Sequence, residues 1–133
     1  MLNPFPQLLI YGFFAPTLLR VAVGITFFFL AYAFWRKRAD VVKITFPVVG
    51  HMPQWLVWFS VVFEVAVGIA LVVGYGTQVA AILGIITALK HLWRWKRFAH
   101  LLPFSQSTYY LLALICLSLL LTGAGALAFD LPL

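Results

Sequence analysis

Glu64 is a carboxylic acid near the middle of an apolar stretch, residues 55–75, that is long enough to cross a lipid bilayer. A carboxylate in hydrocarbon is costly unless it is neutral, paired or facing a polar cavity. Arg20 is the other charge that stands plainly inside an apolar stretch. Because a guanidinium can donate two parallel hydrogen bonds to a carboxylate, we expect Arg20 and Glu64 to form a buried ion pair.

Two interpretations of this pair remain open. In the structural one, a neutralised pair fixes which helices face each other, with Asp130 as a third member near the outer surface. In the functional one, the pair lines a polar pocket that opens outward, where Arg20 hydrogen-bonds a quinone carbonyl or an anion and Glu64 exchanges protons. An ionisable residue inside a membrane is a functional-site hypothesis by default.

The composition indicates the elements that hold these residues. Of the 133 residues, 65% are hydrophobic and only 9% charged, whereas a soluble domain has about a quarter charged residues. At about 20 apolar residues per spanning helix, the chain has room for four spans and no separate soluble domain. We predict an all-α, integral membrane four-helix bundle that forms a single domain over residues 1–133. The predicted spans are residues 13–35, 55–75, 77–93 and 109–127.

Helix geometry predicts how the pair meets. With the first span entering at residue 13, Arg20 lies ~10 Å deep at the rise of an α-helix. Counted back from residue 75, Glu64 lies ~16 Å deep on the antiparallel second span. Gly24 and Gly68 then face the two charges and leave room for their side chains. We expect these glycines to pack the helices closely at the site.

Charge asymmetry predicts the orientation. Lys and Arg remain on the cytoplasmic side of spanning helices, and the basic residues gather in the first and third connections. Loops 36–54 and 94–108 should therefore be cytoplasmic, with both termini on the non-cytoplasmic side of the cell inner membrane. The net charge of +6 fits anionic lipid headgroups rather than nucleic acid, because the basic residues alternate with Trp and Phe beside apolar spans. The interfacial basic cluster consists of Arg36, Lys37, Arg38, Arg94, Lys96 and Arg97.

Several site types have no pattern in this sequence. The three histidines, His51, His91 and His100, fall at the predicted cytoplasmic boundary, so we expect interfacial side chains and not a pair of haem ligands at mid-membrane. The single cysteine, Cys116, excludes an intramolecular disulfide and a cysteine zinc site. The sequence has no Ser-His-Asp set and no HExxH motif. We expect no metal, no haem and no set of catalytic residues.

The order of these segments resembles the DoxX family of small four-helix membrane proteins. The resemblance rests on LLRVAVGITFFFLAYAFW in the first span, on residues 48–83 with Glu64, Gly68, Gly74 and Thr77, and on LLLTGAGALAFDLPL at the end. It implies a bundle loosely related to subunits of thiosulfate:quinone oxidoreductases, in a family often labelled as quinol-oxidase subunits or as membrane partners in oxidative-stress complexes. The basic third connection, and a third helix that runs into Lys90 and His91, depart from the family pattern.

The sequence therefore predicts a quinone-associated redox subunit, or a membrane anchor for a redox protein, rather than an enzyme acting alone. The sequence does not identify a cofactor, and quinone is the one candidate. A redox protein and a second copy of the chain are the candidate protein partners, beside the lipid bilayer. A carrier for a small solute or a proton, in which the same pair gates a path, is the first alternative. The second is a structural scaffold with no activity of its own.

Overall fold

The computed structural model describes residues 11–12, 14–43, 45–46, 50–51, 53–99, 102–125 and 127–129. The candidate site residue Asp130 lies outside these residues. The side chains of Arg94, Lys96 and Arg97 are likewise outside the described part, although their backbone belongs to a helix.

The regular secondary structure of the described residues is helical apart from one pair of two-residue strands, so the predicted all-α class is confirmed. The elements in chain order are α1 (Ala15–Arg36), α2 (Arg38–Val42), β1 (Thr45–Phe46), β2 (Gly50–His51), α3 (Gln54–Val73), α4 (Thr77–Phe98) and α5 (Gln106–Thr122). The strands β1 and β2 pair antiparallel within the connection between α2 and α3.

The helix ends follow from local backbone chemistry. Proline stands in the first turn of α1, where its missing amide hydrogen would have no helical partner anyway. Helix α3 ends at Gly74, whose φ of 77° is a left-handed conformation that glycine adopts without steric cost. Helix α5 ends at Thr122, earlier than the predicted 127, because Gly123 and Gly125 both have positive φ. Helix α4 extends to Phe98, beyond the predicted end at residue 93.

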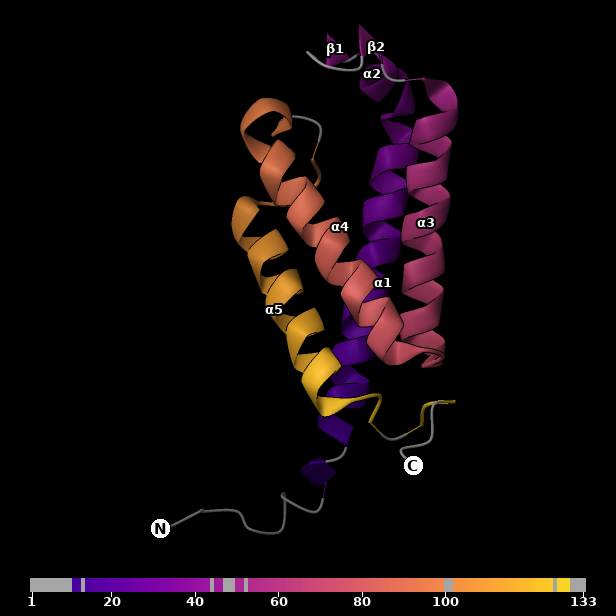
Figure 1. Ribbon diagram of the computed structural model, residues 1–133, viewed down its shortest axis with the longest axis vertical. Coiled ribbons are helices and arrows are strands. Elements are labelled where there is room, and N and C mark those ends of the chain that lie inside the picture. Colours follow the sequence, from indigo (N-terminus) through magenta and orange to yellow (C-terminus); the bar gives the residue numbers. More distant parts are fainter. Residues whose placement is uncertain are drawn as a thin grey trace.

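The four long helices lie side by side as two closely packed pairs, α1 with α3 and α4 with α5 (Figure 1). One end of this bundle carries α2, the two strands and the carboxyl end of α4, and we call it the basic end because Arg36, Lys37 and Arg38 lie there. The other end carries the start of α1, the turn between α3 and α4, and residues 123–125 and 127–129; we call it the terminal end.

Close approach of α1 and α3 depends on two glycines. A Cβ added to Gly24 would lie 2.6 Å from Val72 Cγ2 and 3.0 Å from the Gly68 carbonyl oxygen. A Cβ added to Gly68 would lie 3.1 Å from the Gly24 carbonyl oxygen. Gly24 and Gly68 therefore face each other directly, and the helices are packed backbone against backbone at this level.

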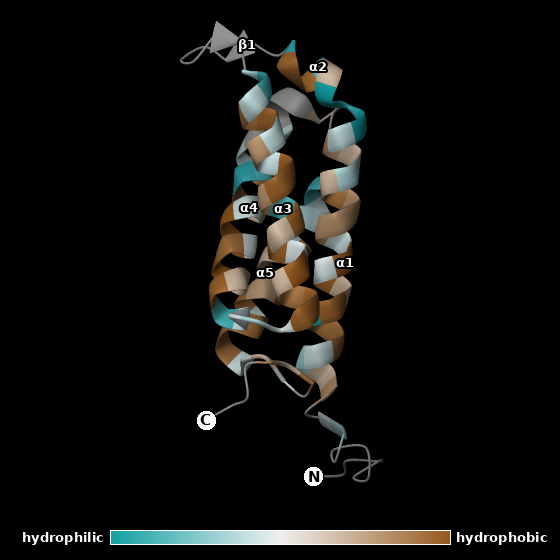
Figure 2. Cartoon of the chain, turned by 90° about the vertical axis from the view of Figure 1, so that its right-hand side faces the viewer, coloured by the Kyte–Doolittle hydropathy of each residue, from teal (hydrophilic) through white to brown (hydrophobic). Residues whose placement is uncertain are grey.

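The long helices consist mostly of hydrophobic residues along their length (Figure 2). Helices α1 and α3 are each long and apolar enough to cross a membrane, and Thr77–Trp93 and Gln106–Thr122 are shorter apolar segments. Large apolar side chains point outward from all four long helices, among them Leu18, Phe29, Phe59, Ile86 and Leu121. This surface suits lipid. That all four helices cross the bilayer stays a prediction.

Candidate functional site

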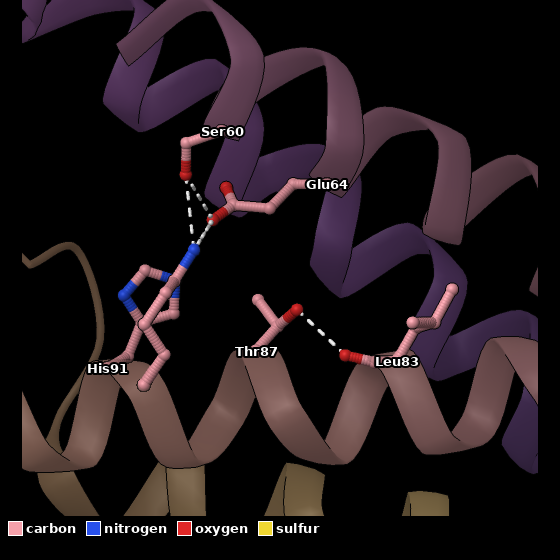
Figure 3. A network of polar contacts seen from close by, with 6 residues as sticks. Ser60, Glu64, Leu83, Thr87 and His91 are labelled. Atoms are coloured by element: carbon pink, nitrogen blue, oxygen red, sulfur yellow. Dashed lines mark hydrogen bonds and ion pairs between the residues drawn. The ribbon is translucent and has the colours of Figure 1, made fainter. Parts of the chain in front are cut away.

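Glu64 lies at the centre of a polar cluster between α3 and α4 (Figure 3). Its side chain has no exposed surface. His91 Nε2 lies 3.0 Å from Glu64 Oε1, and Lys90 Nζ donates to the same oxygen at 3.3 Å. One carboxylate oxygen thus contacts an imidazole and an ammonium group, and both come from α4.

Ser60 extends this cluster by one turn of α3. Its hydroxyl accepts a hydrogen bond from Lys90 Nζ at 3.1 Å and donates to Glu64 Oε1 at 3.5 Å. Since residues 60 and 64 are four apart, they share one face of α3. Lys90 therefore contacts two neighbouring positions of α3 at once. We call Ser60, Glu64, Lys90 and His91 the Glu64 cluster.

His91 is held between aromatic rings. Its ring stacks on Phe34 of α1 at a centroid distance of 5.1 Å, and it lies 5.3 Å from the ring of Tyr109 of α5. Only 2% of His91 is exposed. If Glu64 is ionised, Nε2 must carry the hydrogen that lies between the two groups, because a carboxylate only accepts. Residues of all four long helices therefore meet at this histidine.

The second carboxylate oxygen of Glu64 differs from the first in its contacts. Glu64 Oε2 is buried and has no hydrogen-bond partner among the described residues. The neighbouring polar side chain of Thr87 does not serve it, because the Thr87 hydroxyl donates to the Leu83 carbonyl of its own helix at 2.8 Å (Figure 3). A buried acceptor without a donor is costly, so Oε2 is the oxygen of this site whose hydrogen-bonding capacity the described residues leave unused.

The predicted ion pair between Arg20 and Glu64 is wrong. The Arg20 guanidinium donates to the carbonyl oxygens of Ala124 at 2.9 Å and Leu127 at 3.1 Å. It also occupies the space next to Gly74, where any Cβ would clash with it. Gly74 is ten residues beyond Glu64, which is ~15 Å along a helix.

The reason for this error lies in helix register and in the direction that the arginine takes. Gly24 faces Gly68 and Val72, so Arg20, one turn earlier, is level with the end of α3 and not with Gly68. There it meets backbone carbonyls that follow the end of α5, where no helix remains to supply donors. Gly24 and Gly68 consequently contact each other. The prediction that these glycines face the two charges is therefore wrong.

The remaining predicted residues are distributed as follows. Arg36 and Arg38 are exposed at the basic end, and the Arg38 guanidinium lies 4.9 Å from the ring of Trp35. Lys37 is half-buried. His91, which was expected to be interfacial, is buried inside the bundle.

Sequence reasoning missed Ser60, Lys90 and His91 as members of the site. The signal for Ser60 was its position four residues before Glu64. The signal for Lys90 and His91 was their place at the end of an apolar run in α4, whose full length, to Phe98, puts them well inside the helix. Both were instead placed at the membrane boundary, because the predicted span ended at residue 93, only two residues after His91.

Comparison with known proteins identifies the family of the chain. The family model described as DoxX matches residues 15–93, well over half of the chain, and the matched part includes Arg20 and the whole Glu64 cluster. It does not extend to α5 or to the carbonyls that Arg20 contacts. Neither a curated protein nor a solved structure matches the chain. With the matched segment spanning α1, α3 and most of α4, the chain belongs to the DoxX family of membrane proteins.

Proposed function

We propose that this protein is a quinone-associated membrane subunit of a redox system, in which Glu64 and His91 exchange protons with the quinone headgroup. The observation that carries the proposal is Glu64 Oε2, a buried carboxylate oxygen with no hydrogen-bond donor among the described residues. A quinol hydroxyl is a donor that fits such an acceptor. The aromatic rings of Phe34 and Tyr109 flank His91 and make the surroundings of the Glu64–His91 pair apolar.

The proposed reaction requires one partner, a redox protein that supplies or accepts the electrons. Reducing a quinone to a quinol takes two electrons and two protons. A redox protein docked on the bundle supplies the electrons. The Glu64–His91 pair supplies protons, since a proton can reside on either the carboxylate or the imidazole across their 3.0 Å contact. Oxidation of a quinol uses the same groups in reverse, with Glu64 and His91 accepting the protons.

The proposed setting is the cell inner membrane with the basic end in the cytoplasm. Arg36 and Arg38 are exposed at that end, as is the Lys43 side chain beside Asp40. Cytoplasmic loops carry an excess of Lys and Arg, and anionic headgroups attract them. Both chain termini then lie on the non-cytoplasmic side. The acidic side chains of a docked redox protein would form ion pairs with these exposed cations.

The packing of α1 against α3 favours this function over a carrier. A carrier for a proton or small solute needs a path between the two ends of the bundle. Between Arg20 and the Glu64 cluster lies an apolar layer in which at most 2% of each side chain is exposed, formed by Val23, Phe27, Val67 and Leu71. With Gly24 and Gly68 in backbone contact at the same level, this layer separates the two charged positions.

Quinone binding by the purified protein tests the proposal. Protein reconstituted in nanodiscs is titrated with a short-chain ubiquinone, and quenching of tryptophan fluorescence reports binding. Glu64→Gln should weaken binding about tenfold, because it keeps an acceptor oxygen but removes the charge that strengthens the hydrogen bond, and a tenfold change corresponds to about 1.4 kcal/mol. Thr87→Val is the matched control, since it removes a buried hydroxyl that bonds only to its own helix.

The outcomes separate the three functions. Weaker binding in Glu64→Gln and unchanged binding in Thr87→Val supports the quinone function. Equal binding in all three proteins, or no binding by the wild type, contradicts it. A proton flux across proteoliposomes that disappears in Glu64→Gln would favour the carrier instead, and loss of stability alone would favour the scaffold.

A further inference from the structure

We infer that Glu64 exchanges protons with the basic end of the bundle through Lys90 and Ser60, and that the terminal end is closed to it. The inference concerns how the site proposed above receives its protons, and it rests on that function for the use made of them. It reverses the sequence-based expectation of a pocket that opens at the opposite, outer side.

Exposure within the Glu64 cluster is graded. The Glu64 side chain has no exposed surface and His91 only 2%, whereas 26% of the Lys90 side chain is exposed. The ammonium group of Lys90 thus contacts the buried carboxylate while part of its side chain reaches the surface of the bundle. Lysine commonly lays its apolar stem along a helix and directs its charge toward the membrane boundary. Lys90 stands eight residues before the end of α4, so the basic end is only ~12 Å away along the helix.

The hydrogen bonds supply a route for a proton. A proton on Lys90 can pass to the Ser60 hydroxyl at 3.1 Å while the hydroxyl gives up its own proton to Glu64 Oε1. The direct contact of Lys90 with Glu64 at 3.3 Å is the shorter alternative. Either way one N–H bond breaks and one O–H bond forms on Glu64. Water that reaches the exposed part of the Lys90 side chain from the basic end then reprotonates the neutral amine, and His91 can take the proton onward from Glu64.

Two features separate Glu64 from the terminal end of the bundle. The first barrier is the apolar layer of Val23, Phe27, Val67 and Leu71 described above, which contains no group that can carry a proton. The second consists of residues 123–125 and 127–129, which Arg20 holds at the terminal end by its bonds to the carbonyls of residues 124 and 127. This segment passes close to the end of α3, because a Cβ on Gly74 would lie 2.9 Å from Ala128 Cα.

The charged and titratable groups that surround Glu64 agree with this direction. Helix α4 contributes Lys90 and His91, and α5 contributes Tyr109, whose ring neighbours His91. The charged residues of α1 are Arg20 and Arg36, which stand near its two ends. Helix α3 carries no other charge. Among these groups, Lys90 is therefore the one that connects Glu64 to an exposed surface.

Isotope-edited infrared spectroscopy can follow this exchange, because Glu64 is the only glutamate of the chain. Protein labelled with ¹³C-glutamate is reconstituted in sealed vesicles. Trypsin cleavage at the exposed Arg36 and Arg38 reports which side the basic end faces. The pH is then stepped on one side, and the carboxyl band of the labelled glutamate is recorded over time.

The band of the wild type should respond when the pH is stepped on the side of the basic end and not when it is stepped on the other. Lys90→Met, which keeps the apolar stem, should slow that response about a hundredfold, the lower end of what a positioned proton donor contributes. Lys43→Met is the matched control. It removes a lysine at the same end that pairs with Asp40 and not with Glu64, so it should leave the rate unchanged.

A response to the terminal side, an equal response to both sides, no response to either, or an unchanged rate in Lys90→Met would overturn the inference. The result is independent of quinone binding. Vesicles that respond from the basic end but bind no quinone would remove the proposed function and leave the proton route standing. Quinone binding without a one-sided response would do the reverse.

Discussion

His91 Nε2 lies 3.0 Å from Glu64 Oε1, across the interface between α3 and α4, although the two residues are 27 positions apart in the chain. Arg20, the residue whose charge was expected to pair with Glu64, bonds instead to backbone carbonyls at the terminal end. The two buried charged residues therefore make separate sets of contacts, at different levels of the bundle. Glu64 belongs to an acid–base cluster inside the bundle, and Arg20 holds the segment that follows the last helix.

Removing the carboxylate should destabilise the contact between α3 and α4. Glu64→Leu leaves the buried His91 nitrogen without its acceptor, and an unsatisfied buried donor costs about 1–3 kcal/mol. Glu64→Gln keeps an acceptor oxygen and should lose less. Thermal unfolding of the detergent-solubilised protein measures both, and the Tm should fall in the order wild type, Gln, Leu. A Leu variant as stable as the wild type would show that this contact contributes nothing to the fold.

Replacing Arg20 should release the C-terminal segment without affecting the Glu64 cluster. Arg20→Met removes both hydrogen bonds to residues 124 and 127, and a bond from a charged donor is worth roughly 1.5–3 kcal/mol. Amide hydrogen exchange should speed up over residues 123–129, and Arg20→Lys should give an intermediate rate because an ammonium lacks the planar fork. The same exchange map of Glu64→Gln is the control and should keep those residues protected. Equal protection in Arg20→Met and the wild type would contradict the assignment.

The sequence was sufficient for the class of fold and insufficient for the partners of Glu64. Apolar run lengths located helices near their observed positions, because this signal acts within a short stretch of the chain. The partner of Arg20 depended on the rotation and depth of two helices, and an error of one helical turn was enough to place Arg20 against the wrong level of α3. Whether His91 lies inside the bundle or at its boundary depended on where α4 ends. The predicted end at residue 93 has no proline or glycine to mark it, and the helix continues beyond it.

Adding a methyl group between α1 and α3 should destabilise the bundle. In Gly24→Ala the new Cβ would lie 2.6 Å from Val72 Cγ2 and 3.0 Å from a backbone oxygen that cannot move aside freely. Overpacking of this kind costs about 1–3 kcal/mol. Unfolding in a denaturing detergent measures the loss. Gly12→Ala is the control, because no heavy atom lies within 4 Å of its Cβ position, and it should unfold like the wild type. Equal losses in both variants would argue against close packing at Gly24.

Helices α4 and α5 also approach closely, at Gly84 and Cys116, and here a second substitution should offset the effect of the first. A Cβ on Gly84 would lie 2.8 Å from Cys116 Sγ, so Gly84→Ala should be destabilising. Cys116→Ala removes that sulfur, and in its presence Gly84→Ala should cost less. Interaction energies between contacting residues are on the order of 0.5–3 kcal/mol, and a double-mutant cycle of unfolding free energies measures them. Additive effects of the two substitutions would place these residues out of contact.

The central claim is that quinone reaches the carboxylate of Glu64, and the infrared spectrum of that one group tests it directly. Short-chain ubiquinol is added to protein labelled with ¹³C-glutamate, and the difference spectrum is recorded in the carboxyl region, where Glu64 is the only labelled acid of the chain. We predict a shift of the Glu64 band that saturates with ubiquinol concentration and is absent in Glu64→Gln. A band that stays unchanged at saturating ubiquinol would contradict the account.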